Sequence, residues 1–111
     1  MDELPFRKVT AIVSEPVLVK VEEALMAIGV PGMSVMRVEG YGEYANFFRR
    51  PPLVRHMRVE IFAARDQASA IIDAIHSAAS TGMPGDGIIA VLPVEQLWSI
   101  RSRAPVAPSA R

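Results

Sequence analysis

The order in which strand-like and helix-like apolar patterns follow one another constrains the fold of this chain more than any other feature. Residues 8–13 alternate in the way of a half-buried strand. Pro16 can then open a helix and Gly29 can end it. The apolar residues between them recur at helical spacing: Val17, Val21, Ala24, Leu25 and Ile28. The first part of the chain is therefore predicted to form a strand followed by an amphipathic helix.

The same alternation continues with one extra strand. Residues 33–41 and 56–62 indicate two strands, Asp66 can cap a second helix, and residues 88–92, IIAVL, indicate a buried strand. The apolar stripe of the second helix is Ala68, Ile71, Ile72, Ile75 and Ala79. This order, βαββαβ, is typical of an α+β ferredoxin-like fold with an antiparallel sheet. Residues 33–41 carry apolar side chains on both faces, which favours a partner surface on one of them.

Length and composition limit the function classes. The chain has 111 residues, half of them hydrophobic, which suits one compact domain. We expect residues 1–103 to form this domain and residues 104–111, APVAPSAR, to be a flexible tail. Twelve basic residues offset twelve acidic ones, which argues against nucleic acid as a partner. With neither cysteine nor a leader-like or membrane-spanning apolar run, we expect a cytoplasmic protein that does not insert into a membrane.

The stretch TGMPGDG, residues 81–87, places three glycines between the second predicted helix and the last strand. Such a loop exposes successive backbone N–H groups that can converge on a phosphate, and glycines permit a close approach. The alternative is an ordinary turn after a helix that Gly82 caps.

Three segments show a family resemblance. TGMPGDGIIAV resembles the B-loop of PII signalling proteins and the strand that follows it. Residues 24–42, ALMAIGVPGMSVMRVEGYG, are similar to the PII stretch that leads to the base of the T-loop, and RVEIF is similar to the strand after that loop. The resemblance spans about residues 9–103. It implies a homotrimer that binds adenine nucleotides in clefts between subunits, where the nucleotide sets the state of a T-loop that engages a transporter or an enzyme.

The resemblance also implies a set of nucleotide-binding residues. Those expected at the phosphates, around the base, at the foot of the T-loop and in the C-terminal segment are Gly85, Asp86, Gly87, Ile88, Ile12, Ser34, Gly40, Phe62, Tyr41, Gly42, Arg101 and Arg103.

Three departures from the family pattern remove positive charge from the phosphate end. The lysine that usually follows Gly-Asp-Gly is Ile88, the arginine that usually follows the Gly-aromatic-Gly is Glu43, and one of two C-terminal arginines is Ser99. Each lost charge-assisted contact costs about 1.5–3 kcal/mol. We therefore expect AMP or ADP to be favoured over ATP, and a cyclic nucleotide stays compatible.

The equivalent of the T-loop, residues 42–56, is several residues shorter than in nitrogen-regulatory PII proteins and lacks their tyrosine modification motif. It combines aromatic and cationic residues that suit a small anion or a protein partner: Tyr44, Phe47, Phe48, Arg49, Arg50, Arg55 and His56. A solvated basic loop is the alternative. The short loop resembles the PII-like proteins associated with inorganic carbon uptake and carboxysomes, which makes bicarbonate a candidate co-ligand.

Catalytic and metal sites are not indicated. The two histidines, His56 and His76, have no cysteine or carboxylate cluster around them, so we expect surface histidines and no dedicated metal site. No nucleophile with a base and an orienting residue can be assembled, so we expect a non-enzymatic regulator. Two other functions stay open: a nucleotide-independent adaptor that docks on a membrane transporter, and a small phosphate-handling enzyme.

Overall fold

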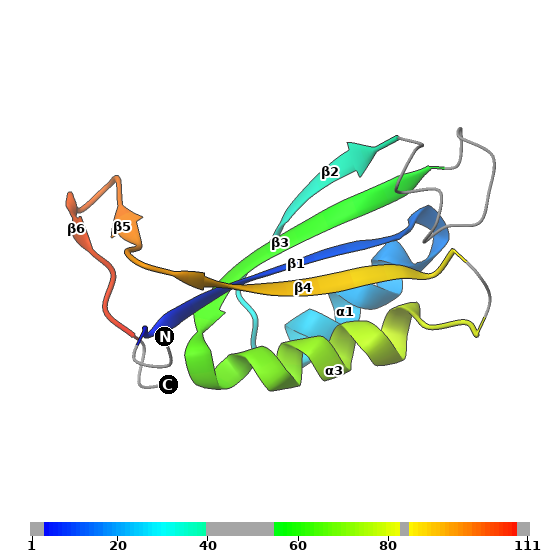
Figure 1. The fold of residues 1–111 in the computed structure, drawn as a ribbon, viewed down its shortest axis with the longest axis horizontal. Helices are drawn as coiled ribbons and strands as arrows, with labels where there is room; N and C mark the ends of the chain where they lie inside the picture. Colours follow the sequence, from blue (N-terminus) through cyan, green and yellow to red (C-terminus); the bar gives the residue numbers. More distant parts are fainter. Residues whose placement is uncertain (1–3, 40–54, 83–84, 109–111) are drawn as a thin grey trace.

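The computed structural model describes residues 4–39, 55–82 and 85–108. A four-stranded antiparallel sheet is covered on one face by two helices (Figure 1). In chain order its elements are β1 (Phe6–Ser14), a 3-10 turn (Glu15–Val17), α1 (Leu18–Ala27), β2 (Ser34–Val38), β3 (His56–Ala64), a second 3-10 turn (Arg65–Gln67), α3 (Ala68–Ala79) and β4 (Gly87–Val94). The strands lie in the order β2-β3-β1-β4. This arrangement confirms the predicted α+β ferredoxin-like fold.

Strand β1 lies in the middle of the sheet and supplies the centre of the core. Val9, Ala11 and Val13 are at most 2% exposed. The helices bury Val21, Leu25, Ile71 and Ile75 against the same cluster. The alternating residues of β1 and the helically spaced residues of α1 and α3 therefore pack into the same core.

The ends of helix α3 differ from the prediction. Asp66 was expected to cap this helix, but it lies inside the preceding 3-10 turn and the N-cap position is Gln67. The backbone N–H of Ala64 donates to Oε1 of Gln67 at 3.3 Å. At the other end the C-cap is Ser80 in an extended conformation, so Gly82, with φ of +79°, belongs to the loop and does not cap the helix.

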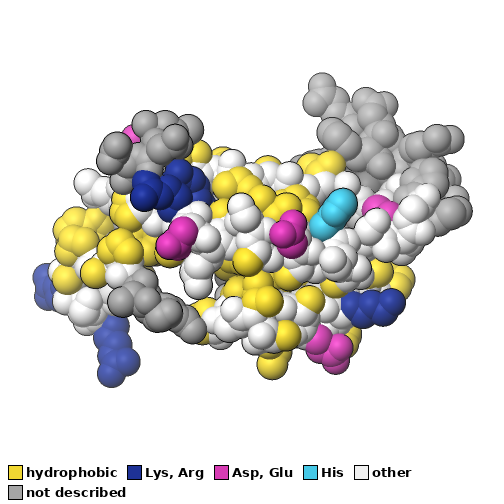
Figure 2. Space-filling model, turned by 90° about the horizontal axis from the view of Figure 1, so that it is seen from below, with side chains coloured by type: hydrophobic (Ala, Val, Ile, Leu, Met, Phe, Trp, Pro, Cys, Tyr) yellow, Lys and Arg dark blue, Asp and Glu magenta, His cyan; other side chains and the backbone are white. Residues whose placement is uncertain are grey.

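The sheet face opposite the helices exposes apolar side chains. Met36 is 39% exposed, Phe62 53% and Leu92 43%. Val35, on the other face of β2, is also 39% exposed, as expected for a strand with apolar residues on both faces. Apolar side chains reach the surface on the helix side too, where Figure 2 shows them between charged ones.

A short hairpin follows β4 and projects from the end of the sheet (Figure 1). It consists of β5 (Trp98–Ser99) and β6 (Ala104–Pro105). The predicted domain boundary at residue 103 falls inside this hairpin, so pairing extends past it. Trp98 is 56% exposed, and its Nε1 donates to Oε1 of Gln96 at 2.9 Å.

Within the part of the chain that the structure describes, no helix is long and apolar enough to cross a membrane.

Gly87 is required by the contact between β4 and β1. A Cβ built on it would lie 1.8 Å from the backbone oxygen of Ile12, and its φ is +115°. We predict that Gly87→Ala lowers the free energy of unfolding by about 2–4 kcal/mol, because the strand must shift and the backbone is strained.

Two glycines provide matched controls in chemical denaturation. Gly82→Ala meets open space but keeps a positive φ, so we expect a loss of about 1 kcal/mol. Gly32→Ala meets nothing within 4 Å and should change stability by less than about 0.5 kcal/mol. Equal losses for Gly87→Ala and Gly82→Ala would contradict the close contact with β1.

Candidate functional site

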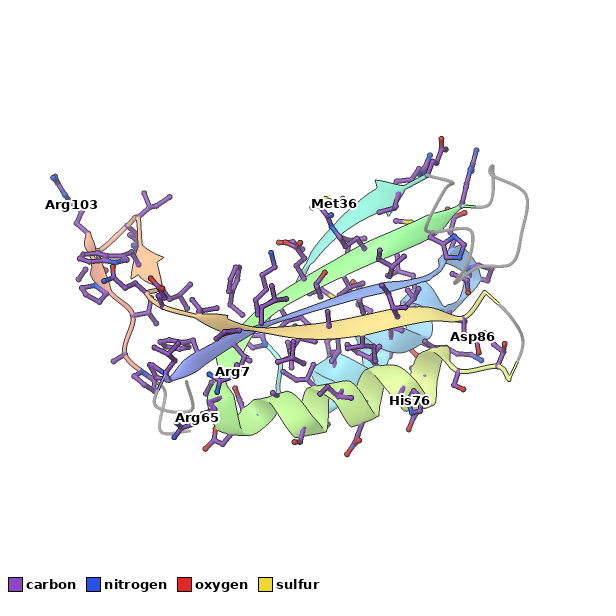
Figure 3. The ribbon with its side chains drawn as sticks, in the orientation of Figure 1. Arg7, Met36, Arg65, His76, Asp86 and Arg103 are labelled. Atoms are coloured by element: carbon purple, nitrogen blue, oxygen red, sulfur yellow. The ribbon has the colours of Figure 1, made fainter. Side chains whose placement is uncertain are left out.

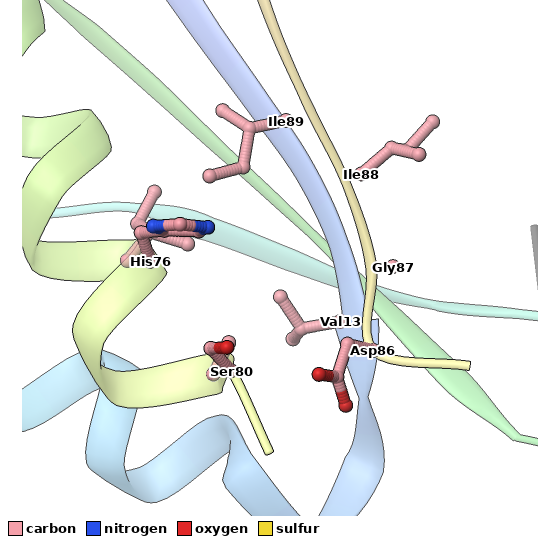
Figure 4. Close-up of a pocket in the computed structure, with 9 residues that line it drawn as sticks. Val13, His76, Ser80, Asp86, Gly87, Ile88 and Ile89 are labelled. Atoms are coloured by element: carbon pink, nitrogen blue, oxygen red, sulfur yellow. The ribbon is translucent and has the colours of Figure 1, made fainter. Parts of the chain in front are cut away.

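The glycine loop lies at one end of the sheet, where α3 ends and β4 begins. The register of β1 and β4 places Ile12 opposite Ile88 and Val13 opposite Gly87. A pocket of about 350 Å³ opens beside the loop (Figure 4). Its lining residues are Val13, Ile75, His76, Ala79, Ser80, Asp86, Gly87, Ile88 and Ile89. Of the predicted nucleotide-binding residues, this end of the sheet gathers Ile12 and residues 85–88.

The Asp86 side chain closes the glycine loop on itself. Its carboxylate accepts the backbone N–H of Thr81 at 2.7 Å, the hydroxyl of Thr81 at 2.5 Å and the backbone N–H of Gly82 at 3.1 Å. Because a carboxylate repels phosphate, the group of Asp86 that suits an anion is its backbone N–H. The sequence contains a signal for the loop-closing role of the Asp86 side chain, since Asp side chains commonly accept hydrogen bonds from nearby backbone N–H groups in turns.

Gly85 and Gly87 are each required in the loop for a different physical reason. Gly85 has φ of +96°, a backbone conformation that favours glycine. Gly87 also has a positive φ, but its lack of a side chain is needed by the β1 backbone of the same chain. On sequence grounds, Gly87 is explained by the close approach of a phosphate. The contact with β1 accounts for this glycine without a phosphate.

His56 was expected to be a surface residue and a donor of the loop over residues 42–56, and its expected surface position is wrong. It is the first residue of β3, it is 2% exposed, and its Nε2 lies 3.3 Å from the backbone oxygen of Gly85. The alternation of β3 puts His56 on the same side as Arg58 and Glu60. The strand pattern therefore could not indicate its burial.

Most of the predicted anion or partner loop lies outside the described residues. This holds for Tyr44, Phe47, Phe48, Arg49 and Arg50. Three of the predicted nucleotide-binding residues, Gly40, Tyr41 and Gly42, also lie outside the described residues. Arg55, the residue before β3, is described and exposed.

The other predicted nucleotide-binding residues that the structure describes lie away from the glycine loop. Phe62 pairs with Lys8, four residues along β1 from Ile12, or about 13 Å at the usual strand rise. Ser34 pairs with Glu60 and lies on β2, at the opposite edge of the sheet from β4. Arg101 and Arg103 are exposed in the hairpin segment, and Figure 3 shows Arg103 and Asp86 at opposite ends of the molecule. One chain therefore does not bring the full predicted set into one site.

The charge around the pocket is low. Its lining residues include one carboxylate, that of Asp86, and neither lysine nor arginine. Figure 4 shows Ile88 and Ile89 pointing to opposite sides of β4, with Ile89 on the side of α3.

The face toward which Ile88 points carries a cation two strands away. Arg58 pairs with Ile12, and its Nε lies 3.4 Å from Oε2 of Glu60. Lys8 contacts the same carboxylate oxygen at 3.5 Å. The carboxylate is thus shared by two cations, and part of their charge is neutralised.

Comparison with known proteins adds the family. A family model described as nitrogen regulatory protein P-II matches residues 6–104. A nitrogen regulatory protein P-II from Cereibacter sphaeroides is 37% identical over 103 residues, which cover 86% of this chain and 92% of that protein. Nitrogen regulatory protein GlnK from Escherichia coli K12 is 33% identical over 101 residues, with 85% and 90% covered.

A solved structure agrees with the sequence relatives. The crystal structure of Arabidopsis thaliana PII bound to citrate superimposes with a TM-score of 0.80 at 35% identity and covers 93% of this chain and 90% of that chain. The family resemblance found in the sequence is therefore confirmed over nearly the whole chain. The chain belongs to the nitrogen regulatory P-II family, whose members are signalling proteins and not enzymes.

Proposed function

We propose that this P-II family member is a cytoplasmic regulator that binds ADP or AMP in preference to ATP, in clefts between three copies of the chain. The bound nucleotide then controls a contact with a target protein, a transporter or an enzyme. The observation that carries the nucleotide preference is the lack of lysine and arginine beside the glycine loop in the described part of the chain: Ile88 follows Gly-Asp-Gly, and neither residue type is among the lining residues of the adjoining pocket.

The distribution of the predicted site residues supports a cleft between copies. The glycine loop and the hairpin of β5 and β6, whose connection contains Arg101, lie at opposite ends of one chain (Figure 1). A site that contains both therefore needs two chains. The projecting hairpin is suited to reach a neighbour, since it carries the exposed side chains of Trp98 and Ile100 next to Arg101.

The open face of the sheet supports the assembly. Met36, Phe62 and Leu92 are each between 39% and 53% exposed there, beside the ion pairs of Glu60. Burial of apolar area of this kind drives association, and closed rotational symmetry lets three identical faces cover one another.

We predict a homotrimer in solution, with a mass of three times the 12.1 kDa chain by light scattering. Phe62→Glu should weaken the trimer, because it places a charge in the buried contact. Val19→Glu, at a 61% exposed position on α1, is the matched control and should leave the mass unchanged. A monomer at micromolar concentration, with or without nucleotide, would reject the shared cleft.

The nucleotide preference follows from counting charge-assisted contacts. The β- and γ-phosphates of ATP carry charge that backbone N–H groups alone stabilise less well than lysine or arginine would. Each missing contact removes about 1.5–3 kcal/mol, so the outermost phosphate loses most.

We predict that AMP or ADP binds more tightly than ATP in calorimetry at fixed salt. Ile88→Lys should raise ATP affinity about tenfold or more and leave AMP nearly unchanged, because the new cation lies at the phosphate end. Ala90→Lys adds the same charge two residues along β4, on the same face, and should have a smaller effect. Equal gains for the two variants, or no gain, would show that the phosphates lie elsewhere.

The proposed output is in inorganic carbon uptake or carboxysome function, with bicarbonate as the co-ligand. Its support is the resemblance of the short loop, together with the cations of residues 49–55, because a guanidinium can donate two hydrogen bonds to one oxyanion. Binding of ADP and of bicarbonate must then be coupled reciprocally.

We predict that bicarbonate tightens ADP binding about fivefold compared with chloride at the same pH and ionic strength. Hydrogen exchange of residues 43–56 should slow with ADP and slow further with bicarbonate. Identical ADP affinities in the two salts would reject bicarbonate as co-ligand. Absence of any nucleotide binding would favour the nucleotide-independent adaptor instead.

A further inference from the structure

The imidazole of His56 is buried where three parts of the chain meet. In the register of the sheet, His56 stands opposite Val38 of β2 on one side and Ser14 of β1 on the other. The third part is the glycine loop, which reaches His56 through the backbone oxygen of Gly85. Only 2% of His56 is exposed, which is a low value for a titratable side chain.

The contact between His56 and Gly85 has a defined direction. A carbonyl oxygen can only accept, so Nε2 must carry the hydrogen and donate it. The separation of 3.3 Å is longer than the usual 2.9–3.0 Å of an N–H···O bond. The imidazole side of the bond is shielded from water because His56 is 2% exposed, whereas Gly85 is partly buried. A hydrogen bond that is partly shielded from water is stronger than one at the open surface.

The bond fixes the orientation of one peptide unit. In a trans peptide the C=O of Gly85 and the N–H of Asp86 point in opposite directions. Gly85 has φ of +96°, and a glycine can adopt the backbone angles of both orientations of the following peptide. Without a tie, the loop would therefore have little reason to present the Asp86 N–H on one particular side.

We propose that His56 is a positioning residue of the glycine loop: its Nε2–H holds the Gly85 carbonyl toward β3 and thereby directs the Asp86 N–H away from β3, as an anion donor. The carboxylate of Asp86 accepts hydrogen bonds from Thr81 and Gly82, so the loop is fixed at both of its ends, by Asp86 on the helix side and by His56 on the sheet side. The role as an anion donor rests on the proposed nucleotide binding, whereas the orientation of the peptide does not.

The orientation is tested on the nucleotide-free protein by NMR. The ring nitrogen spectrum should show His56 with its hydrogen on Nε2, and the ring N–H should exchange slowly, whereas the ring N–H of the exposed His76 should exchange fast. A His56 ring with its hydrogen on Nδ1 alone would overturn the proposal without any variant.

Two substitutions separate positioning from simple filling of space. His56→Gln keeps a donor of similar reach, whereas His56→Leu fills the site without one. The carbonyl carbon of Gly85 and the amide of Asp86 should shift in His56→Leu and stay close to wild type in His56→Gln. Equal shifts in the two variants would reject the tie, and the free energy of unfolding of each variant shows whether the fold is retained.

Affinity for ADP then tests the anion donor. Loss of one oriented neutral donor should weaken ADP about three- to tenfold in His56→Leu, with recovery to within about twofold in His56→Gln. If ADP binds wild type and both variants equally, the positioning role is wrong while nucleotide binding stands. If ADP does not bind wild type, the proposed function fails, and the NMR result alone decides the orientation of the peptide.

Discussion

Strand β1 is paired on both sides along nearly its whole length, and the position of the candidate site depends on that pairing. All nine residues of β1 pair with β3, and eight of them pair with β4. The end of β1 therefore brings the start of β3 and the start of β4 together, and with them the glycine loop. The contact is close enough that Gly87 tolerates no Cβ against the backbone of Ile12. A shift of this register by one residue would separate the loop from its neighbours and turn the core side chains outward.

The glycine loop is held mainly by interactions within the chain. Asp86 bonds to Thr81 and Gly82, and His56 contacts Gly85. A loop prepared in this way loses less conformational entropy when an anion binds, so backbone N–H groups can contribute affinity without a lysine. The lack of cations also limits which ligands the loop can bind. The negative charge of a triphosphate needs more stabilisation than backbone N–H groups supply. The low charge and the hydrogen bonds at both ends of the loop thus argue together for a ligand with fewer phosphates.

Sequence periodicity predicted the strands, the helices and their order. Each element has one face in the same core, and its apolar residues therefore recur with the period of a strand or of a helix. Local details were less accessible. Asp66 was a plausible cap by residue type, but the chain enters α3 through a 3-10 turn that leaves Gln67 at the cap position. The burial of His56 could not be read from β3, since it depends on segments that pack around the end of the strand. The separation of the loop from the hairpin segment that contains Arg101 could not be predicted either, because it depends on where the chain runs after β4.

The central claim is that the glycine loop of one copy and Arg101 of another form a single nucleotide site. Mixed trimers of Ile88→Glu chains and Arg101→Glu chains test it directly, provided that neither variant alone binds ADP. If the site is shared, about a quarter of the clefts in a random mixture contain neither substitution. Calorimetry should then recover ADP binding with wild-type affinity at about that stoichiometry. If both groups act within one chain, every site in the mixture carries one of the two changes, and a complete absence of recovered binding would contradict the account.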